Sequence, residues 1–423
     1  MLKLKKVNIF DVLYIMIGCP WLFYMIMTSR SHTVIKTILL FSLVMICVTE
    51  IIIKKKALFK RDYFIYTAFF IIYFSVSLMH GIISGYEFSL KNDFALIQYF
   101  IITPICITII SYTMNLEKKR SFFIWRYLEY LTVVLVFLDL FSILLYKKGV
   151  SIPILDFIKI SSNHTTDELS LRVSNEVSLM FLLPIYLYMA FQMDKLMIKD
   201  KIVIIIIISI GCIYVLLSGR KITELILLTE IVYIFFSKIH NRKIVVKKIF
   251  INLISGVIIL VSLFYILNYV SNSLNIEDIF NKATSTLRNG ISKNHIGVVK
   301  RNNNLIALFN LWLQSPIWGN GLNSYAIESL ASSKTFWSYE IIYNALLAQT
   351  GIIGVTIFAI GCVYILKKLL KKYKKSNNEK YMAVFLGFLS FVLCGATNPL
   401  VYIMWPWIVS LIISDEELEI SEK

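Results

Sequence analysis

Residues 271–354 decide how the fold is interpreted, because they form the only long polar segment in an otherwise apolar sequence. The segment contains Ser315-Pro-Ile-Trp-Gly-Asn-Gly321 and returns to an apolar run at Tyr339-Glu-Ile-Ile-Tyr-Asn344. It closes on Gln349-Thr-Gly-Ile-Ile-Gly354. Cationic side chains, glycine turns and one carboxylate are therefore gathered where the chain enters apolar sequence again.

On both sides of this segment the composition is that of a membrane protein. Hydrophobic residues make up 58% of the 423 positions, charged residues only 16%, and the mean hydropathy is +0.73. Apolar runs of roughly 18–22 residues recur along the chain, which is the length that spans a bilayer as a helix. These runs lack the two-residue alternation of a membrane barrel. The sequence predicts an all-α, polytopic membrane protein with about 12 transmembrane helices.

The predicted spans follow the apolar runs, and the last run breaks at Asn398-Pro399 into a hairpin of two helices. They cover residues 7–27, 34–53, 63–83, 94–114, 124–146, 172–193, 202–217, 222–236, 249–270, 341–366 and 381–414. We expect one integral membrane domain, residues 1–423, with a large loop at residues 271–340 between the ninth and tenth spans.

The orientation follows from the distribution of the 43 Lys and Arg residues. With the N-terminus inside, the inner segments hold the larger share of them, although the outer segments include the longest loop. Cytoplasmic loops carry the excess of Lys and Arg in membrane proteins. We expect both termini in the cytoplasm and the long loop outside.

Other functional classes lack support in the sequence. The net charge of +17 is explained by basic cytoplasmic loops, so no nucleic-acid partner is expected. All six cysteines lie in apolar runs without paired spacing, which indicates packing residues. No P-loop and no HExxH motif is present. We expect no metal ion and no cofactor.

Four outward-facing arginines are the first candidates for a site: Arg172, Arg220, Arg288 and Arg301. An arginine at a helix end often reaches to the lipid headgroups, and that is the structural alternative for each. Guanidinium groups bind phosphate oxygens through a two-pronged fork, so a cluster of them suits a lipid-linked phosphate or pyrophosphate. The pattern therefore allows an anion site on the outer side.

The carboxylate of Glu340 directly precedes an apolar run. It is either a helix-start carboxylate favoured by the helix dipole or a general base at the outer leaflet. Lys221, His295 and Asn344 fall on the same predicted side and complete the candidate substrate-binding residues. Aromatic residues flank the loop's glycines as interface anchors or as a platform for sugar rings: Trp312, Trp318, Phe336, Trp337 and Tyr339.

Several ordered pieces of residues 172–404 resemble the O-antigen polymerase and O-antigen ligase family. Leu217-Ser-Gly-Arg220 resembles the family's short outer turn, and Arg301 followed by Pro316-Ile-Trp-Gly-Asn-Gly321 resembles its large outer loop. Leu346-Leu-Ala-Gln-Thr-Gly-Ile-Ile-Gly354 looks like the start of the helix after that loop, and Asn398-Pro399 resembles the late break. The ligases carry a His-Asn pair eleven residues before the first glycine of that helix start. Glu340-Ile341 stands there instead, which favours a polymerase.

The resemblance implies a membrane glycosyltransferase of the cytoplasmic (inner) membrane that uses a lipid-linked sugar donor. It would polymerise oligosaccharide units carried on undecaprenyl pyrophosphate into O-antigen, capsule or exopolysaccharide. Arg220 and Arg301 would hold the donor pyrophosphate, assisted by Arg172 and Arg288, and Glu340 would act on the acceptor hydroxyl. Donor and acceptor glycans, the lipid bilayer, a chain-length regulator and a flippase are the expected partners. The alternatives are a ligase-type transferase, a polysaccharide flippase or transporter, and an assembly protein without chemistry.

Overall fold

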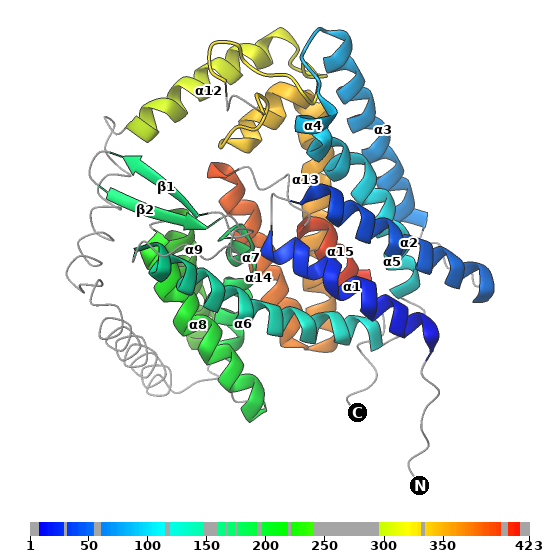
Figure 1. Ribbon diagram of the computed structural model, residues 1–423, viewed down its shortest axis with the longest axis vertical. Helices are drawn as coiled ribbons and strands as arrows, with labels where there is room; N and C mark the ends of the chain where they lie inside the picture. The colour runs from blue at the N-terminus through cyan, green and yellow to red at the C-terminus, as the bar shows by residue number, and fades with distance from the viewer. Residues whose placement is uncertain are drawn as a thin grey trace.

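The computed structural model describes residues 8–28, 32–54, 61–114, 119–147, 160–165, 168–173, 176–192, 197–218, 221–240, 296–330, 335–398 and 405–414. These residues form a bundle of helices with one helix, α12, across its top (Figure 1). The first half contains α1 (Ile9–Met27), α2 (Thr33–Lys54), α3 (Arg61–Ile83), α4 (Leu90–Ile97), the π-helix η1 (Gln98–Ile102), α5 (Thr103–Met114) and α6 (Lys119–Lys147). The second contains β1 (Ile160–Thr165), β2 (Glu168–Val173), α7 (Glu176–Ala190), α8 (Ile198–Ser218), α9 (Lys221–His240), α12 (Ile296–Gln314), α13 (Ile342–Ser376), α14 (Glu379–Cys394), the 3₁₀ turn η4 (Gly395–Thr397) and α15 (Trp405–Ser414).

Six of the described helical segments are long and apolar enough to cross a membrane. They are α1, α2, most of α3, the continuous segment from α4 to α5, α13, and α14 with η4. Their lengths match the roughly 20 helical residues that a hydrocarbon core requires. The protein is therefore a helical, multi-pass membrane protein. The count of about 12 spans stays a prediction.

The helix predicted from residue 172 is wrong at its start. Arg172 lies in β2, which pairs antiparallel with β1 and places Ser161 opposite Arg172. Polar and apolar residues alternate along β2, as in a strand with one apolar face. Helix α7 begins only at Glu176. The alternation covers only the six residues of β2, which is too short a signal beside the long apolar run that follows, and the described fold is otherwise helical.

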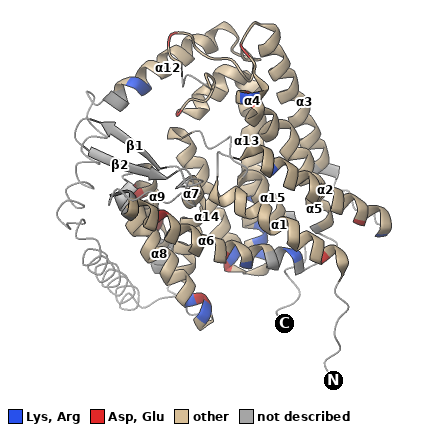
Figure 2. Cartoon of the chain, in the orientation of Figure 1, with Lys and Arg blue, Asp and Glu red and all other residues tan. Residues whose placement is uncertain are grey.

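Charged residues are found mainly near the ends of the described helices (Figure 2). Arg120 of α6 joins two of these ends, because its guanidinium binds Asp11 of α1 at 2.8 Å and Glu50 of α2 at 2.7 Å. Arg120 and Glu50 are both buried. A buried ion pair with both partners retained is costly to break. The cluster therefore fixes α1, α2 and α6 relative to one another.

Helix α7 lies in the centre of the second half of the bundle. Every described side chain from Val177 to Tyr188 is buried. Ser390 of α14 donates a hydrogen bond to the carbonyl of Met180, and Gly387 of α14 lies against the α7 backbone. Small residues at a helix contact allow the close approach that stabilises membrane bundles. The α7–α14 pair is thus closely packed, and α14 also contacts α13.

Candidate functional site

The structure brings together two of the residues that the sequence singled out, Arg301 and Glu340. The Nε atom of Arg301 donates a hydrogen bond to Oε2 of Glu340 at 3.3 Å. Their side chains are 44% and 56% exposed, respectively, so the pair faces outward from the protein. Within the described part of the chain, the two terminal nitrogens of Arg301 have no hydrogen-bond partner. Those nitrogens are available to a ligand anion, and the carboxylate beside them is available to a hydroxyl.

Helix α12 positions Arg301 through the packing of its inner face. Leu308 and Leu311 are buried against the bundle, as is the polar residue Asn304. The hydroxyl of Ser329 donates a hydrogen bond to the side-chain oxygen of Asn304. A buried amide with a partner fixes the rotation of the helix that carries it. This rotation turns Arg301, three residues before Asn304, toward Glu340.

A break in α13 at Gly351 connects the site to the rest of the bundle. Gly351 has φ 62° and ψ −172°, which interrupts the helix. In an unbroken helix the amides of Ile352 and Ile353 would bond to carbonyls four residues earlier. Here the Ile352 amide donates to the carbonyl of Pro316 at 3.0 Å, and the Ile353 amide donates to that of Ile317 at 3.3 Å. The Pro-Ile-Trp-Gly-Asn-Gly segment thus supplies the missing acceptors.

The same segment also satisfies the carbonyls that the break releases. The Asn320 amide donates to the carbonyl of Ala348 at 3.1 Å, and the Gly321 amide donates to that of Gln349 at 2.8 Å. The side-chain nitrogen of Asn320 donates to Leu311 at 2.6 Å and to Ala348 at 3.1 Å. Asn320 therefore ties α12 to α13. This exchange of hydrogen bonds fixes α12, which carries Arg301, against α13, which begins just after Glu340.

The glycines of the motif are required by backbone contact. Gly319 has φ 78°, and a Cβ on it would lie 2.3 Å from the carbonyl oxygen of Gln349. A Cβ on Gly351 would lie 2.2 Å from the carbonyl oxygen of Ile317. Only glycine adopts such a positive φ without strain and leaves room for a crossing backbone. Gly319 and Gly351 therefore allow the Pro-Ile-Trp-Gly-Asn-Gly segment to pack directly against the backbone of α13.

Two aromatic residues before Glu340 are buried, which corrects the expectation that they are interface anchors or a sugar platform. Trp337 donates from its indole nitrogen to the carboxylate of Asp93 at 2.5 Å. The hydroxyl of Tyr339 accepts a hydrogen bond from the Ala326 amide at 2.9 Å. Burial raises the pKa of Tyr339 to about 12, so this hydroxyl is no base at neutral pH. Both residues fix the backbone next to Glu340.

Gln349 completes the support from the side of α13. Its side-chain nitrogen donates to the carbonyl of Ser324 at 3.1 Å and to that of Trp337 at 3.0 Å. The hydroxyl of Tyr73 on α3 donates to the carbonyl of Thr350 at 2.5 Å. No sequence pattern assigns a positioning role to Gln349 or Tyr73. The quoted motif contained Gln349, whereas nothing in the local sequence pointed to Tyr73, which is 277 positions from its partner.

The remaining predicted site residues are not joined to this pair by any described contact. Asn344 is exposed in the first turn of α13. Arg172 lies in β2 and Lys221 begins α9, and their side chains are outside the described part. Arg220, Arg288 and His295 lie outside the described residues altogether. The convergence of Arg220 with Arg301, and a substrate-binding role for the others, stay predictions.

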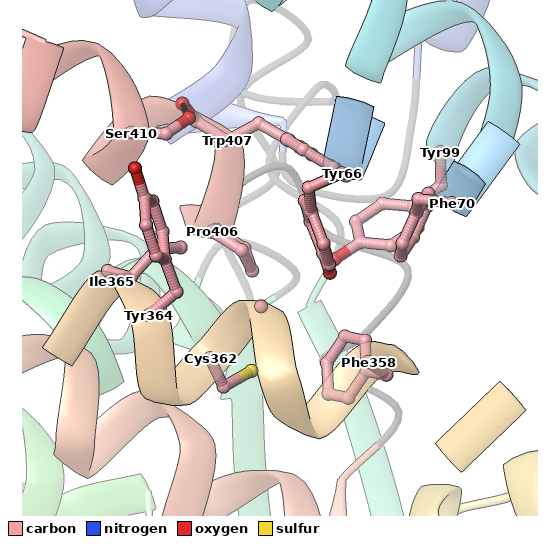
Figure 3. A pocket seen from close by; sticks show the side chains of 11 residues that line it. Tyr66, Phe70, Tyr99, Phe358, Cys362, Tyr364, Ile365, Pro406, Trp407 and Ser410 are labelled. Atoms are coloured by element: carbon pink, nitrogen blue, oxygen red, sulfur yellow. Dashed lines mark hydrogen bonds between the residues drawn. The ribbon is translucent and has the colours of Figure 1, made fainter. Parts of the chain in front are cut away.

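A cavity of about 30 Å³ lies elsewhere, between α3, η1, α13 and α15 (Figure 3). Aromatic rings from these elements surround it, among them Tyr66, Tyr99 and Trp407. Among the described residues, its lining includes no charged residue and no predicted site residue. An apolar cavity of this kind does not fit a pyrophosphate, which requires charged donors.

No protein-family model matches the chain, and no match is found among the curated proteins. The fold and the site therefore define a class by themselves: a helical, multi-pass membrane protein with a paired arginine and carboxylate at one end of its bundle.

Proposed function

We propose that the protein is a membrane glycosyltransferase that joins oligosaccharide units carried on undecaprenyl pyrophosphate. The observation that carries the proposal is the Arg301–Glu340 pair, exposed at one end of a membrane helix bundle. Transfer from a pyrophosphate donor needs a cation for the leaving group and an acceptor for a hydroxyl proton. The pair supplies both within 3.3 Å, and the resemblance of residues 172–404 to the O-antigen polymerases agrees with this chemistry.

The proposed step is a substitution at the anomeric carbon of the donor sugar. The acceptor hydroxyl oxygen forms a bond to that carbon while the bond from the carbon to the pyrophosphate oxygen breaks. The hydroxyl proton passes to Glu340 and then to water, and undecaprenyl pyrophosphate leaves with the bonding electron pair. Arg301, with Arg220 as the predicted second cation, neutralises the leaving group. The donor is already activated, so the step consumes no nucleotide.

The charges of α13 support the outer side of the membrane for this chemistry. Glu340 precedes the first turn of α13, whereas Lys374 and Lys375 lie in its last turn. A spanning helix puts its two ends on opposite sides, and Lys and Arg are concentrated on the cytoplasmic side. The site would therefore face away from the cytoplasm, where flipped lipid-linked units are available. Glu340 in place of the ligase histidine favours a polymerase over a ligase.

The experiment is reconstitution of the full chain in liposomes with undecaprenyl-pyrophosphate-linked repeat units as sole substrate. A polymerase produces a ladder of longer lipid-linked glycans and releases undecaprenyl pyrophosphate. A flippase moves the units across the bilayer without changing their length. A ligase leaves them unchanged until a separate lipid acceptor is added. A thermal unfolding transition verifies that the protein is folded. If folded protein moves the units across the bilayer without elongating them, the proposal is overturned.

A further inference from the structure

Helix α12 has an apolar stripe that the described residues leave exposed. Leu305, Ile306, Phe309 and Leu313 recur at helical spacing along one side of α12. Phe309 is 50% exposed, although it is one of the most apolar residues of the helix. A row of large apolar side chains of this kind marks a protein or membrane contact.

Three exposed polar residues of α12 lie beside the stripe, whereas Asn302 falls within it near its N-terminal end. At about 100° per residue, Asn303, Asn310 and Gln314 fall in one sector, next to the apolar stripe. All three are exposed. The third sector contains Ala307, Leu308 and Leu311, which are buried against the bundle. Helix α12 thus presents one face to the protein, one apolar face and one polar face, which is typical of a helix at a membrane surface.

The apolar stripe continues into the lipid-facing surface of α13. After α12 come the exposed residues Ile317 and Trp318, the latter 65% exposed. Backbone hydrogen bonds from Ile352 and Ile353 place the start of the second part of α13 beside Pro316 and Ile317. From there the exposed residues Ile352, Ile360 and Val363 follow one face of a spanning helix. An exposed apolar face of such a helix contacts lipid, and the α12 stripe extends it.

The length of α13 places this junction near the edge of the bilayer. A hydrocarbon core about 30 Å thick takes roughly 20 helical residues. Counting roughly 20 residues back from Lys371, at the basic end of α13, leads to the Gly351 break. Ile317 and Trp318 adjoin that break. Tryptophan is enriched at this depth, where its ring is in the interface.

We propose that α12 is an interfacial helix whose apolar stripe is immersed in the outer part of one membrane leaflet. The occupant of the stripe is the membrane lipid itself, since the stripe is continuous with the lipid-facing surface of α13. Arg301, in the second turn of α12, and its partner Glu340 are then held at the depth of the lipid headgroups. A phosphate carried by a lipid reaches that depth without leaving the bilayer. The proposal concerns the position of α12 and holds whether or not the protein transfers sugars.

The test is spin-label accessibility in liposomes, with one nitroxide at a time on the full chain free of its native cysteines. Labels at Leu305, Phe309 and Leu313 probe the stripe, and labels at Asn303, Asn310 and Gln314 probe the polar face as matched controls. All six positions are exposed, so the labels disturb no buried contact. Oxygen, which concentrates in lipid, and a water-soluble nickel chelate are the two collision partners.

The proposal predicts a severalfold excess of oxygen over chelate collisions at the stripe and the reverse at the polar face. Equal chelate access on both faces overturns it, because α12 is then surrounded by water. Low access to both reagents at the stripe also overturns it, because another part of the chain or a second copy then covers the stripe. The thermal unfolding midpoint of each labelled protein, compared with the unlabelled chain, verifies that the fold is retained.

Discussion

Arg301 of α12 and Glu340 before α13 form a hydrogen-bonded ion pair at 3.3 Å, although 39 positions separate them in the chain. Both side chains are substantially exposed. An exposed ion pair contributes only about 0–1 kcal/mol to stability. The pair itself therefore adds little to the stability of the fold, and the role proposed for it is the binding of a ligand.

Replacement of Arg301 should separate function from stability. We expect Arg301→Ala to abolish polymer formation, and Arg301→Lys to restore little, because a lysine is a point charge that lacks the guanidinium fork. The free energy of unfolding should change by less than about 1 kcal/mol. Lys300→Ala, at the exposed neighbouring residue, is the matched control and should retain the polymer. Arg220→Ala should behave like Arg301→Ala. Long polymer from both alanine variants would remove the pyrophosphate role.

The support itself can be tested at its glycines. Gly351→Ala puts a Cβ 2.2 Å from the carbonyl oxygen of Ile317 at φ 62°. Backbone strain and the clash together should cost at least about 3 kcal/mol. Gly85 also has a positive φ, 88°, but nothing lies within 4 Å of an added Cβ. Gly85→Ala should therefore cost only about 1–2 kcal/mol. If both variants lost the same thermal stability in detergent, the close contact between Gly351 of α13 and the Pro-Ile-Trp-Gly-Asn-Gly segment would be unimportant for stability.

Asn320 should be the side chain of the motif that matters most for stability. Asn320→Ala leaves the Leu311 carbonyl without its side-chain donor and removes one of two donors to Ala348. A buried polar group without its partner costs about 1–3 kcal/mol. Asn303→Ala, on the exposed face of α12, should change stability by less than about 0.5 kcal/mol. Urea or thermal unfolding of the two variants measures the difference.

Much of the helical framework could be predicted from apolar runs. The helices observed over residues 33–54 and 221–240 begin and end within a few residues of the predicted spans. The β1–β2 hairpin is not predictable in the same way, because only β2 alternates, over 6 residues, and β1 is almost entirely polar. The glycine motif was noticed, but its packing against Gln349 and Tyr73 depends on contacts across the fold, which no local pattern contains.

Individual residues of the candidate site could be predicted from the sequence, but the contacts around them could not. A cation in the long loop pointed to Arg301 and a carboxylate at the edge of an apolar run pointed to Glu340, whereas their contact with each other appears only in the structure. Burial of Trp337 and Tyr339 was not predictable, because an aromatic residue near a membrane edge serves equally as an anchor or as core. Asp93 accepts from Trp337 across 244 positions, a separation that leaves no sequence signal.

The predicted topology has a direct test on α12. A cysteine in place of Asn303 lies on the exposed polar face of the helix and should react with a membrane-impermeant thiol reagent in intact cells. The reason is that the predicted positive-inside arrangement places this segment outside. A cysteine in place of Leu308, which is buried, is the unreactive control. Labelling at position 303 only after the cells are permeabilised would reverse the assignment of sides.

Chain growth by Glu340 variants is the most direct test of the proposed role of Glu340 in sugar transfer. Glu340→Gln keeps the shape of the side chain and removes the base, whereas Glu340→Asp keeps the charge but shortens its reach. Glu328→Gln changes another exposed carboxylate, in the segment between α12 and α13, and serves as the control. Glycan length on the lipid carrier, measured at equal amounts of folded protein, should show single units accumulating with Gln and a trace of polymer with Asp. The Glu328 variant should give full polymer, and full-length polymer from Glu340→Gln would contradict the claim.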